Sequence, residues 1–586
     1  MNVPKVFQQL VTQHPKKVLF YYGNEEWTFQ QVDQFSNKIA NYFIAQGYNH
    51  GDEIALFMDN RPEYVAIWLG LAKAGIVAAL VNTNQRQSTL IHSLSVVNCK
   101  ALIFGSELMK TVNDVYLTLS KSIAHMEYFC YDTADRDDNY VHVDGIDTSS
   151  RDGFEYKSLN NLIGSISDES PEERINLADF TDRLLYIYTS GTEGLPKAAI
   201  IKHSRFIWMG AAVKYMIRIY NDDILYTSLP LYHLAGGTVG VCQSLIFGNT
   251  MAIRNKFSAS NFWKDCVKYK CTVGQYIGEI CRYLLTQPES PYDKMHSVRL
   301  MFGNGLRGSI WNEFVTRFNI GQIGELYGST EGNANIINVD NKEGSCGFIS
   351  QIAPFLYPAT LIKVDENTGE AIRDKNGICV KVQAGETGEF VGKIIENDPT
   401  RAFDGYADKA ANKKKIIYDV FRKGDCAFLS GDLLTMDQFG YLYFKDRCGD
   451  TYRWKGENVS TMEVEAIISN SLHLTDCIVY GVDVPGCEGK AGMAAILDKN
   501  RSFNLDELLS TLRSCLPVFM IPVFIRLVDF LEVTSTHKLP KISFRKDGFN
   551  PSRIKDPLFM FDSKRFCYVK IDQDLYTDIL KGVVKL

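Results

Sequence analysis

The sequence predicts an α/β protein with a large amino-terminal domain of doubly wound sheets and a small, mobile carboxy-terminal α+β domain. The chain has 586 residues, which is long for a single hydrophobic core. Short apolar runs alternate with helical periodicity in residues 15–183, as is typical of parallel βαβ units. Near residue 446 the composition changes to a compact α/β pattern of roughly 130 residues. We therefore expect a large domain at 1–446, a hinge at 447–450 and a small domain at 451–586.

The overall composition is that of an ordinary globular protein. Hydrophobic residues make up 45% and charged residues 23%, and the net charge is -6. A negative net charge gives no excess of basic residues for binding nucleic acid, so a nucleic-acid partner is not expected. The 14 cysteines are scattered without a C-x-x-C pair. They are therefore interpreted as reduced thiols, forming neither a disulfide framework nor a zinc site.

The amino-terminal region shows the first helix and strand. No basic and apolar leader precedes it, so we expect an intracellular chain without a signal peptide. The stretch WTFQQVDQFSNKIANYFIAQGY begins a helix at Thr28, carries apolar residues on one face and ends at Gly47. The following GDEIALFMDN, residues 51–60, reads as a short buried strand.

One apolar stretch has two interpretations. YVAIWLGLAKAGIVAALV, residues 64–81, is barely long enough to span a membrane and carries Lys73 at its middle. The spacing of Ile67, Leu71 and Ala74 fits a buried helix that leads into a strand at least as well.

A polyanion-binding loop follows a strand in LLYIYTSGTEGLPKAAIIKHS, residues 184–204. Glycines let successive N–H groups point at one place, hydroxyls add donors and a lysine adds charge, which suits phosphate oxygens. The spacing differs from the ordinary phosphate-binding loop, because Lys197 follows Pro196 and no Ser or Thr comes next. A glycine-rich hairpin tip is the alternative. The predicted phosphate-binding residues are Thr189, Ser190, Gly191, Thr192, Gly194 and Lys197.

Two further strands end in polar turns. LMFGNGL (300–306) breaks at Gly303, and LYGSTEGN (326–333) breaks after Tyr327. Because ligands of open α/β sheets bind at the carboxyl edge, these turns and the polyanion loop predict one crevice.

These motifs resemble those of a known family. The loop is similar to T-S-G-[ST]-T-G-x-P-K, the phosphate-binding signature of the adenylate-forming enzymes. Together with residues 257–288 and the stretch WKGENVSTMEVEAI, it resembles the subfamily of fatty acid transport proteins, or very-long-chain acyl-CoA synthetases, over nearly the whole chain. The family has Thr where this chain has Glu193, whose carboxylate would repel a triphosphate unless a cation or Lys197 compensates.

The resemblance implies ATP, Mg²⁺ and coenzyme A as cofactor and co-substrates. It implies that Thr330 contacts the α-phosphate, that Glu331 and Thr192 serve the metal, and that Lys538 on the small domain assists adenylation. His233 would contact the carboxylate or the α-phosphate. It further implies that Asp432 accepts the ribose hydroxyls and that Arg447 reaches ribose or phosphate. The residues that would enclose adenine are Gly303, Asn304, Gly305, Tyr327 and Gly328, and Ser329 beside them is also implied to bind nucleotide.

Each of these positions has a plainer reading. His233 could cap a helix or fill the core, Glu331 could be a solvated acidic turn, and Asp432 could only form a turn. Lys541 is the rival of Lys538, because the Pro and Gly of the family's P-T-G-K motif are absent before Lys538.

The small domain should contain a helix that begins at Ser460. Glu463 lies three residues further on and completes a capping box. We expect Glu463 and Glu465 to face solvent.

These inferences lead to an ATP-dependent ligase that joins a long- or very-long-chain fatty acid to coenzyme A through an acyl-adenylate. Residues 257–288, rich in aromatic side chains, would wall an acyl tunnel by resemblance. The alternatives are another adenylating enzyme, or a lipid transport or binding protein whose ligase activity is weak or lost. We also expect peripheral membrane contact, at the endoplasmic reticulum, the plasma membrane or the peroxisome.

Overall fold

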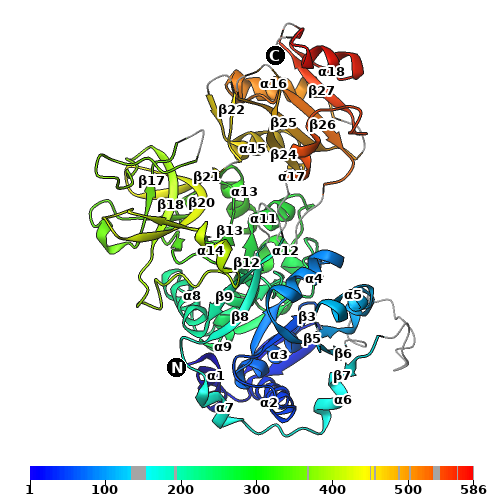
Figure 1. The fold of residues 1–586 in the computed structure, drawn as a ribbon, viewed down its shortest axis with the longest axis vertical. Coiled ribbons are helices and arrows are strands. Elements are labelled where there is room, and N and C mark those ends of the chain that lie inside the picture. Colours follow the sequence, from blue (N-terminus) through cyan, green and yellow to red (C-terminus); the bar gives the residue numbers. More distant parts are fainter. Residues whose placement is uncertain are drawn as a thin grey trace.

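The computed structural model has three sheets in the large domain and a fourth, five-stranded sheet in a separate carboxy-terminal domain (Figure 1). The carboxy-terminal domain lies at the top of the view, above the antiparallel sheet and the two larger sheets. The described residues are 1–123, 125–132, 154–189, 195–365, 369–448, 450–454, 457–485, 487, 489–499, 503–531, 541–563 and 565–584.

The first sheet has seven strands in the order β7-β6-β5-β3-β4-β8-β9. All neighbours are parallel except β8 and β9, as expected from apolar runs separated by helices. The prediction of doubly wound parallel strands is confirmed here. The strands are β3 (Glu53–Phe57), β4 (Val77–Leu80), β5 (Cys99–Gly105), β6 (Glu127–Tyr131), β7 (Lys157–Ser158), β8 (Arg183–Thr189) and β9 (Lys197–Lys202).

The second sheet has eight strands in the order β15-β14-β13-β12-β10-β11-β1-β2, parallel except at its two edges. Its strands are β1 (Val18–Tyr22), β2 (Glu25–Thr28), β10 (Ile224–Thr227), β11 (Thr250–Ile253), β12 (Val273–Ile277), β13 (Leu300–Asn304), β14 (Gln322–Tyr327) and β15 (Ile336–Ile337).

The helices of the large domain connect and cover these sheets. The predicted start at Thr28 is confirmed, because its side chain and that of Gln31 form a reciprocal capping box. The helices are α1 (Val3–Gln13), α2 (Phe29–Ala45), α3 (Pro62–Lys73), α4 (Gln87–Val96), α5 (Met109–Ser122), α6 (Leu159–Gly164), α7 (Glu172–Leu177), α8 (His203–Met216), the π-helix η2 (Leu234–Gly240), α9 (Val241–Leu245), α10 (Phe262–Lys268), α11 (Gly278–Leu285), α12 (Tyr292–Met295), α13 (Gly308–Phe318) and α14 (Lys409–Lys413). Single 3₁₀ turns are η1 (Ser106–Leu108) and η3 (Pro354–Leu356).

The apolar stretch 64–81 forms the buried helix α3 and the strand β4. Lys73 at the end of α3 is fully buried and pairs with Asp33 at 2.6 Å, while Asn37 accepts a second bond at 2.7 Å. A buried charge is tolerated only with such partners. Among the described residues, no helix is both long enough and apolar enough to cross a membrane.

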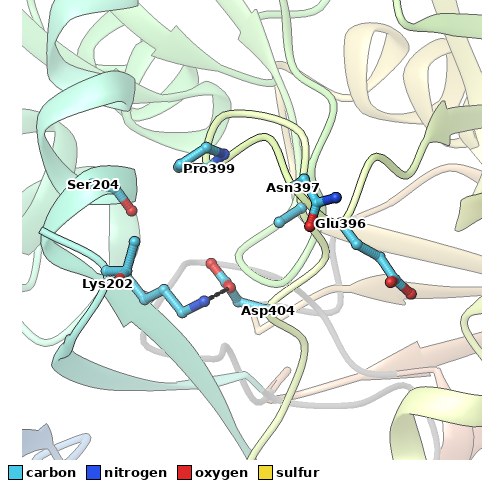
Figure 2. A pocket seen from close by; sticks show the side chains of 8 residues that line it. Lys202, Ser204, Glu396, Asn397, Pro399 and Asp404 are labelled. Carbon is cyan, nitrogen blue, oxygen red and sulfur yellow. Dashed lines mark ion pairs between the residues drawn. The ribbon is translucent and has the colours of Figure 1, made fainter.

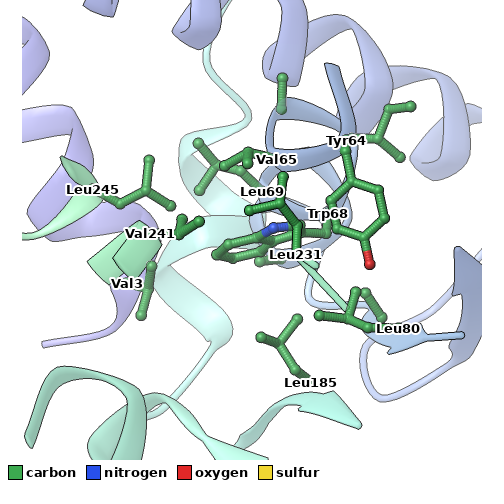
Figure 3. Close-up of a cluster of buried hydrophobic side chains, with 14 of the residues drawn as sticks. Val3, Tyr64, Val65, Trp68, Leu69, Leu80, Leu185, Leu231, Val241 and Leu245 are labelled. Atoms are coloured by element: carbon green, nitrogen blue, oxygen red, sulfur yellow. The ribbon is translucent and has the colours of Figure 1, made fainter. Parts of the chain in front are cut away.

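The main core lies between these two sheets (Figure 3). Trp68 on α3 is fully buried beside Leu231 and Val241, with Leu185 of β8 close by. Side chains from α1, α3, β8 and α9 therefore meet in one cluster, which fixes the two sheets relative to each other. This packing fixes the strand ends of the two sheets relative to each other.

A smaller antiparallel sheet completes the large domain. Its order is β16-β21-β20-β18-β17, and β19 pairs with β20. Residues 436–447, MDQFGYLYFKDR, form the turn and second strand of the β20–β21 hairpin. The strands are β16 (Gly347–Phe348), β17 (Ala359–Ile362), β18 (Thr387–Lys393), β19 (Ile416–Tyr418), β20 (Cys426–Met436) and β21 (Tyr441–Arg447).

The carboxy-terminal domain has its own core around a five-stranded sheet, β24-β25-β26-β27-β28, and a separate hairpin, β22 with β23. The predicted α+β class is confirmed. The elements are β22 (Tyr452–Trp454), β23 (Glu457–Val459), α15 (Thr461–Ser471), β24 (Cys477–Asp483), β25 (Lys490–Leu497), α16 (Leu505–Cys515), η4 (Val518–Met520), β26 (Phe524–Val528), α17 (Ile542–Asp547), β27 (Leu558–Asp562), β28 (Cys567–Lys570) and α18 (Gln573–Leu580).

Helix α15 begins as predicted but buries one residue that we expected in solvent. The Ser460 hydroxyl accepts a bond from the N–H of Glu463. Glu465, however, is only 6% exposed; its carboxylate pairs with Lys541 at 2.8 Å and accepts from the N–H of Val479 at 2.8 Å. The prediction for Glu465 was wrong, because the docking of α15 onto β24 decides which helix face is covered.

Candidate functional site

The candidate site is built from the ends of β8, β13 and β14 and the start of β9, and Tyr406 links Thr189 of β8 to Glu331 in the turn after β14. Thr189 and Lys197 face each other in the register of β8 and β9, on either side of the predicted phosphate loop. Ser190, Gly191, Thr192 and Gly194 were predicted to bind phosphate, and, like Glu193, they lie outside the described residues. Of the residues predicted to bind phosphate, the structure therefore describes Thr189 and Lys197.

Lys197 and Glu331 come together around a buried tyrosine. The Lys197 ammonium lies 5.5 Å from the centre of the Tyr406 ring. The Tyr406 hydroxyl lies between Thr189 and the Glu331 carboxylate, and burial together with that carboxylate raises the pKa of Tyr406. Glu331 itself is 6% exposed and pairs with Lys415 at 3.5 Å. The solvated-turn reading of Glu331 was therefore wrong.

A buried arginine holds the turn that carries Thr330 and Glu331. Arg205 on α8 donates to the carbonyl oxygen of Thr330 at 2.7 Å, to that of Glu331 at 3.2 Å and to that of Gly332. Burial lowers the pKa of Arg205, while the charges of Asp404 and Glu331 oppose that effect. Three consecutive carbonyls held by one rigid guanidinium leave the turn little freedom.

The predicted adenine loop follows β13. Gly303 lies against the carbonyl oxygen of Tyr276, at 1.9 Å from where a Cβ would be, and Gly305 has φ +92°. Both positions therefore require glycine. The carboxylate of Glu325 on β14 accepts from the N–H of Gly305, from the N–H of Leu306 at 3.3 Å and from the Tyr276 hydroxyl. Burial raises the pKa of Glu325 to about 8.

The predicted ribose residue lies opposite β14. Asp432 is inside strand β20 and not in a turn, so its turn reading was wrong; it is opposite Arg447 in the β20–β21 register. The Tyr327 hydroxyl donates to Asp432 at 2.8 Å. Gly431 beside it has φ +81°, and its N–H bonds to Glu389 at 3.0 Å. Two oxygens of one carboxylate suit a cis-diol.

Gly328 and Ser329 continue the turn after β14. A Cβ on Gly328 would meet the Asn335 side chain at 2.0 Å, and the Ser329 hydroxyl accepts from the N–H of Gly332 at 3.1 Å. Asn304 ends β13 and is exposed. The predicted adenine-binding residues therefore share one edge of the sheet.

His233 lies at the start of the π-helix η2. The Asn60 side chain fixes the preceding segment, donating to the Leu229 carbonyl and accepting from the Leu231 N–H, both at 2.8 Å. The His233 ring lies 4.7 Å from that of Tyr232. The residue is half-buried, so it is not a core histidine, and its contact with substrate stays a prediction.

The aromatic stretch 257–288 packs largely in a core cluster. Phe262 is fully buried against Tyr226 with ring centres 4.8 Å apart, and Trp263 is 5% exposed. The tunnel wall implied by resemblance therefore remains a prediction.

A polar pocket lies beside this site (Figure 2). Lys202 at the end of β9 pairs with Asp404 across it at 2.6 Å, and Ser204, Glu396 and Asn397 also line it. A lining this polar does not suit an acyl chain. The Asp404 carboxylate in this lining favours the charged form of the neighbouring Arg205.

Of the two competing lysines, only Lys541 belongs to the described residues; Lys538 lies outside them. The Lys541 ammonium donates to the Thr461 hydroxyl at 2.6 Å and pairs with Glu465. Thr461 in turn donates from its N–H to Asp446 at 2.8 Å. Lys541 thus contacts the junction of the two domains.

The sequence did not single out four residues that shape the site. Tyr406, Arg205 and Glu325 act through long-range contacts that no local pattern encodes. Lys415 belongs to the basic run at 413–415, which was visible in the sequence but had no partner to suggest a role.

The fold and this site define an AMP-binding enzyme, and comparison with known proteins supports that class. The model of the family described as "AMP-binding enzyme" matches residues 7–391. "Long-chain fatty acid transport protein 1" of Homo sapiens is 47% identical over 587 aligned residues, covering 100% of this chain and 88% of that protein. "Long-chain fatty acid transport protein 2" of Rattus norvegicus is 41% identical, covering 99% of this chain and 91% of that protein. The chain therefore belongs to the AMP-binding enzyme family and, within it, to the long-chain fatty acid transport proteins.

Solved structures show the same fold at low identity. The anthranilate CoA ligase AuaEII, in complex with anthranoyl-AMP, has a TM-score of 0.74 at 18% identity, covering 93% of this chain and 97% of its own. A Mycobacterium tuberculosis fatty acyl CoA synthetase has a TM-score of 0.62 at 20% identity, covering 93% and 98%. These likenesses confirm the predicted fold class.

Proposed function

We propose that this protein is an ATP-dependent ligase that joins a long- or very-long-chain fatty acid to coenzyme A through an acyl-adenylate. The observation that carries the proposal is the meeting of Lys197, Tyr406 and Glu331, together with the hydrogen bond from Tyr327 at the end of β14 to Asp432. A polyanion and a sugar diol would each find suitable partners there. Membership of the fatty acid transport proteins supports the acyl substrate.

Each side of the crevice has its own task in the first half-reaction. Asp432 and Tyr327 would orient the ribose, and the Gly303–Gly305 loop held by Glu325 would receive adenine. Thr189 and Lys197 would hold the phosphates. A fatty carboxylate is ionised at neutral pH, so it can attack the α-phosphorus without a base. The bond to pyrophosphate breaks as the bond to the carboxylate oxygen forms.

The residues present fit a magnesium ion bound together with a nucleotide. Glu331 offers a carboxylate, and Mg²⁺ is commonly held by one or two carboxylates plus substrate phosphates. Among the described residues, no group of three or more His, Cys, Asp or Glu side chains is arranged as a complete metal cage. Glu331, with Thr192, would hold the ion, which offsets negative charge on the phosphates. Lys415, which pairs with Glu331, would add a second positive charge to this site.

The second half-reaction requires the small domain to move about the proposed hinge, 447–450. Lys538 would stabilise the charge that develops during adenylation and then leave the site, after which the thiol of coenzyme A displaces AMP. Activation as the adenylate is needed because a free carboxylate is a poor acyl donor, whereas AMP is a good leaving group.

The second candidate is a lipid transport or binding protein with weak ligase activity. The observation that favours it is Glu193, where the family signature has Thr. Two like charges about 4 Å apart at an effective dielectric near 20 repel by about 4 kcal/mol, enough to weaken ATP binding about a thousandfold. A large gain in ATP affinity in Glu193→Thr would support this candidate, whereas a modest change supports the ligase.

The test of the proposed function is ATP–pyrophosphate exchange that depends on added fatty acid. A ligase exchanges only when its acid is present, and a passive binder does not exchange. A panel of medium-chain to very-long-chain acids measures the chain-length preference in the same assay. Shorter carboxylates, such as acetate and benzoate, distinguish another adenylating enzyme.

A further inference from the structure

Arg282 of the large domain is clamped onto the small domain. It lies on α11, is 5% exposed, and its guanidinium donates to the carbonyl oxygen of Leu474 and pairs with Asp476, both just after α15. Its Nε donates to Glu279 at 2.7 Å. Burial alone lowers the pKa of Arg282, but the Glu279 and Asp476 carboxylates outweigh that effect and raise it. One buried guanidinium therefore joins groups from both domains.

An apolar contact accompanies the ion pair. Leu474 has a left-handed backbone, with φ 61°, and packs against the large-domain cluster that contains Trp263 and Tyr276. A non-glycine residue at positive φ carries strain that its surroundings must offset. Leu474 is therefore held in two ways: its side chain packs on the large domain, and its carbonyl oxygen accepts a hydrogen bond from Arg282.

Helix α15 connects this clamp to the hinge side of the interface. The N–H and hydroxyl of Thr461, its first residue, bind Asp446 at 2.8 Å and 3.0 Å. Its 11 residues span about 16 Å, at 1.5 Å per residue. The small domain is thus fixed at two separated points, so losing one point frees rotation about the other.

The clamp also reaches the adenine loop. Gly278, the first residue of α11, packs so closely on the Gly305 carbonyl oxygen that a Cβ would lie 1.7 Å from it. Glu279 shares its carboxylate between Arg282 and Arg307, which lies 3.3 Å away and follows that loop in the sequence. A movement of α11 would therefore displace both the Gly303–Gly305 loop and the contacts with the small domain.

We propose that Arg282 is a positioning residue that locks the small domain in the orientation used for adenylation and couples that orientation to nucleotide at the Gly303–Gly305 loop. This rests on the proposed function for the name of the half-reaction. The adenylation orientation is part of this proposal, and comparing the two half-reactions tests it.

The test compares Arg282→Gln and Asp476→Asn with Arg317→Gln in the full-length protein. Arg317 is the matched control, because it pairs with Asp293 at 2.9 Å and donates to two carbonyl oxygens wholly inside the large domain. Adenylation, measured by exchange, should fall about tenfold in both clamp variants, the scale of one charge-assisted hydrogen bond. Thioester formation from supplied acyl-adenylate should not fall, and Arg317→Gln should affect both half-reactions equally or neither.

Domain orientation is read independently of activity. Spin labels on Tyr215→Cys and on the exposed Cys515, in a protein with Cys487 changed to Ser, report the distance between the domains. Arg282→Gln should broaden that distance distribution, and by reciprocal linkage its ATP affinity, measured by calorimetry, should fall several-fold. Arg282→Lys, which keeps the charge, should recover part of both effects.

Two results would overturn the inference. One is an unchanged distance distribution in Arg282→Gln; the other is an equal loss of both half-reactions in the clamp variants. If the unaltered protein shows no fatty-acid-dependent exchange, the proposed function fails, and the distance and ATP-affinity measurements still decide whether Arg282 locks the domains.

Discussion

The Tyr327 hydroxyl donates a 2.8 Å hydrogen bond to Asp432, a residue 105 positions further along the chain. The bond ties the end of β14 to the middle of β20, so residues from two sheets share one surface. Burial raises the pKa of Tyr327, which keeps its hydroxyl protonated and able to donate. Tyr327, predicted to contact adenine, and Asp432, predicted to bind ribose, are therefore joined directly by a hydrogen bond.

Removing this bond should weaken ATP binding with little effect on turnover. Ribose contacts are similar in the ground and transition states, so Asp432→Ala should raise the KM for ATP by about tenfold or more at nearly constant kcat. Tyr327→Phe removes one hydrogen bond and should raise KM about fivefold. The control is Tyr443→Phe, which removes a 3.2 Å bond to Asp437 on the same hairpin. A fall in kcat without a change in KM would contradict this assignment.

Glu331→Gln should lower the rate at fixed Mg²⁺ by more than about tenfold, because one charge-assisted contact to the ion is lost. The Mg²⁺ concentration at half-maximal rate, and Mg²⁺-dependent ATP affinity by calorimetry, should both rise. Glu386→Gln is the control, since Glu386 also pairs with a lysine, Lys363, at 2.7 Å, but is more exposed and is not among the residues assigned to the site. Identical Mg²⁺ titrations would remove Glu331 from the site.

Substitutions of Lys538 and Lys541 should have different effects on the two half-reactions. Lys538→Ala should block acyl-adenylate formation and leave thioester formation from supplied acyl-adenylate largely intact. Lys541→Ala removes the ion pair with Glu465 and should lower the thermal midpoint, because a buried carboxylate loses its partner. If Lys541→Ala alone abolishes adenylation, Lys541 is the adenylation lysine and the sequence assignment is wrong.

Glu325 should make stability depend on pH. Its pKa is raised by burial from 4.5 to about 8, so the folded protein keeps a proton that the unfolded chain has lost in this range. This contribution to stability is full below about pH 4.5 and is lost as the pH rises to about 8. The thermal midpoint of Glu325→Gln, relative to that of the unaltered protein, should therefore be higher at pH 8 than at pH 5. Parallel profiles of the two proteins across that range would contradict the effect.

The parts of this fold that the sequence predicted are those with a local cause. Strands β8 and β13 are recognisable because apolar runs end abruptly in glycine and hydroxyl residues, and α2 because Thr28 and Gln31 lie one helical turn apart. The edge of the sheet that gathers these strand ends follows from parallel topology alone.

The parts that could not be predicted depend on contacts between distant segments. Arg205 meets the Thr330 turn 125 residues later, and nothing near either residue suggests the pairing. Glu465 is buried because α15 docks with that face inward, although its charge favours solvent. Lys415 was visible as a charge, but only the fold places it beside Glu331.

We propose that this chain forms an acyl-adenylate and passes the acyl group to coenzyme A. The most direct measurement is mass spectrometry of the protein incubated with a very-long-chain fatty acid, ATP and Mg²⁺, before and after coenzyme A is added. Acyl-adenylate should form first and then be converted to acyl-CoA with release of AMP, and Glu331→Gln should form the adenylate more than about tenfold more slowly. Retention of bound fatty acid with no adenylate at any time would contradict the proposal.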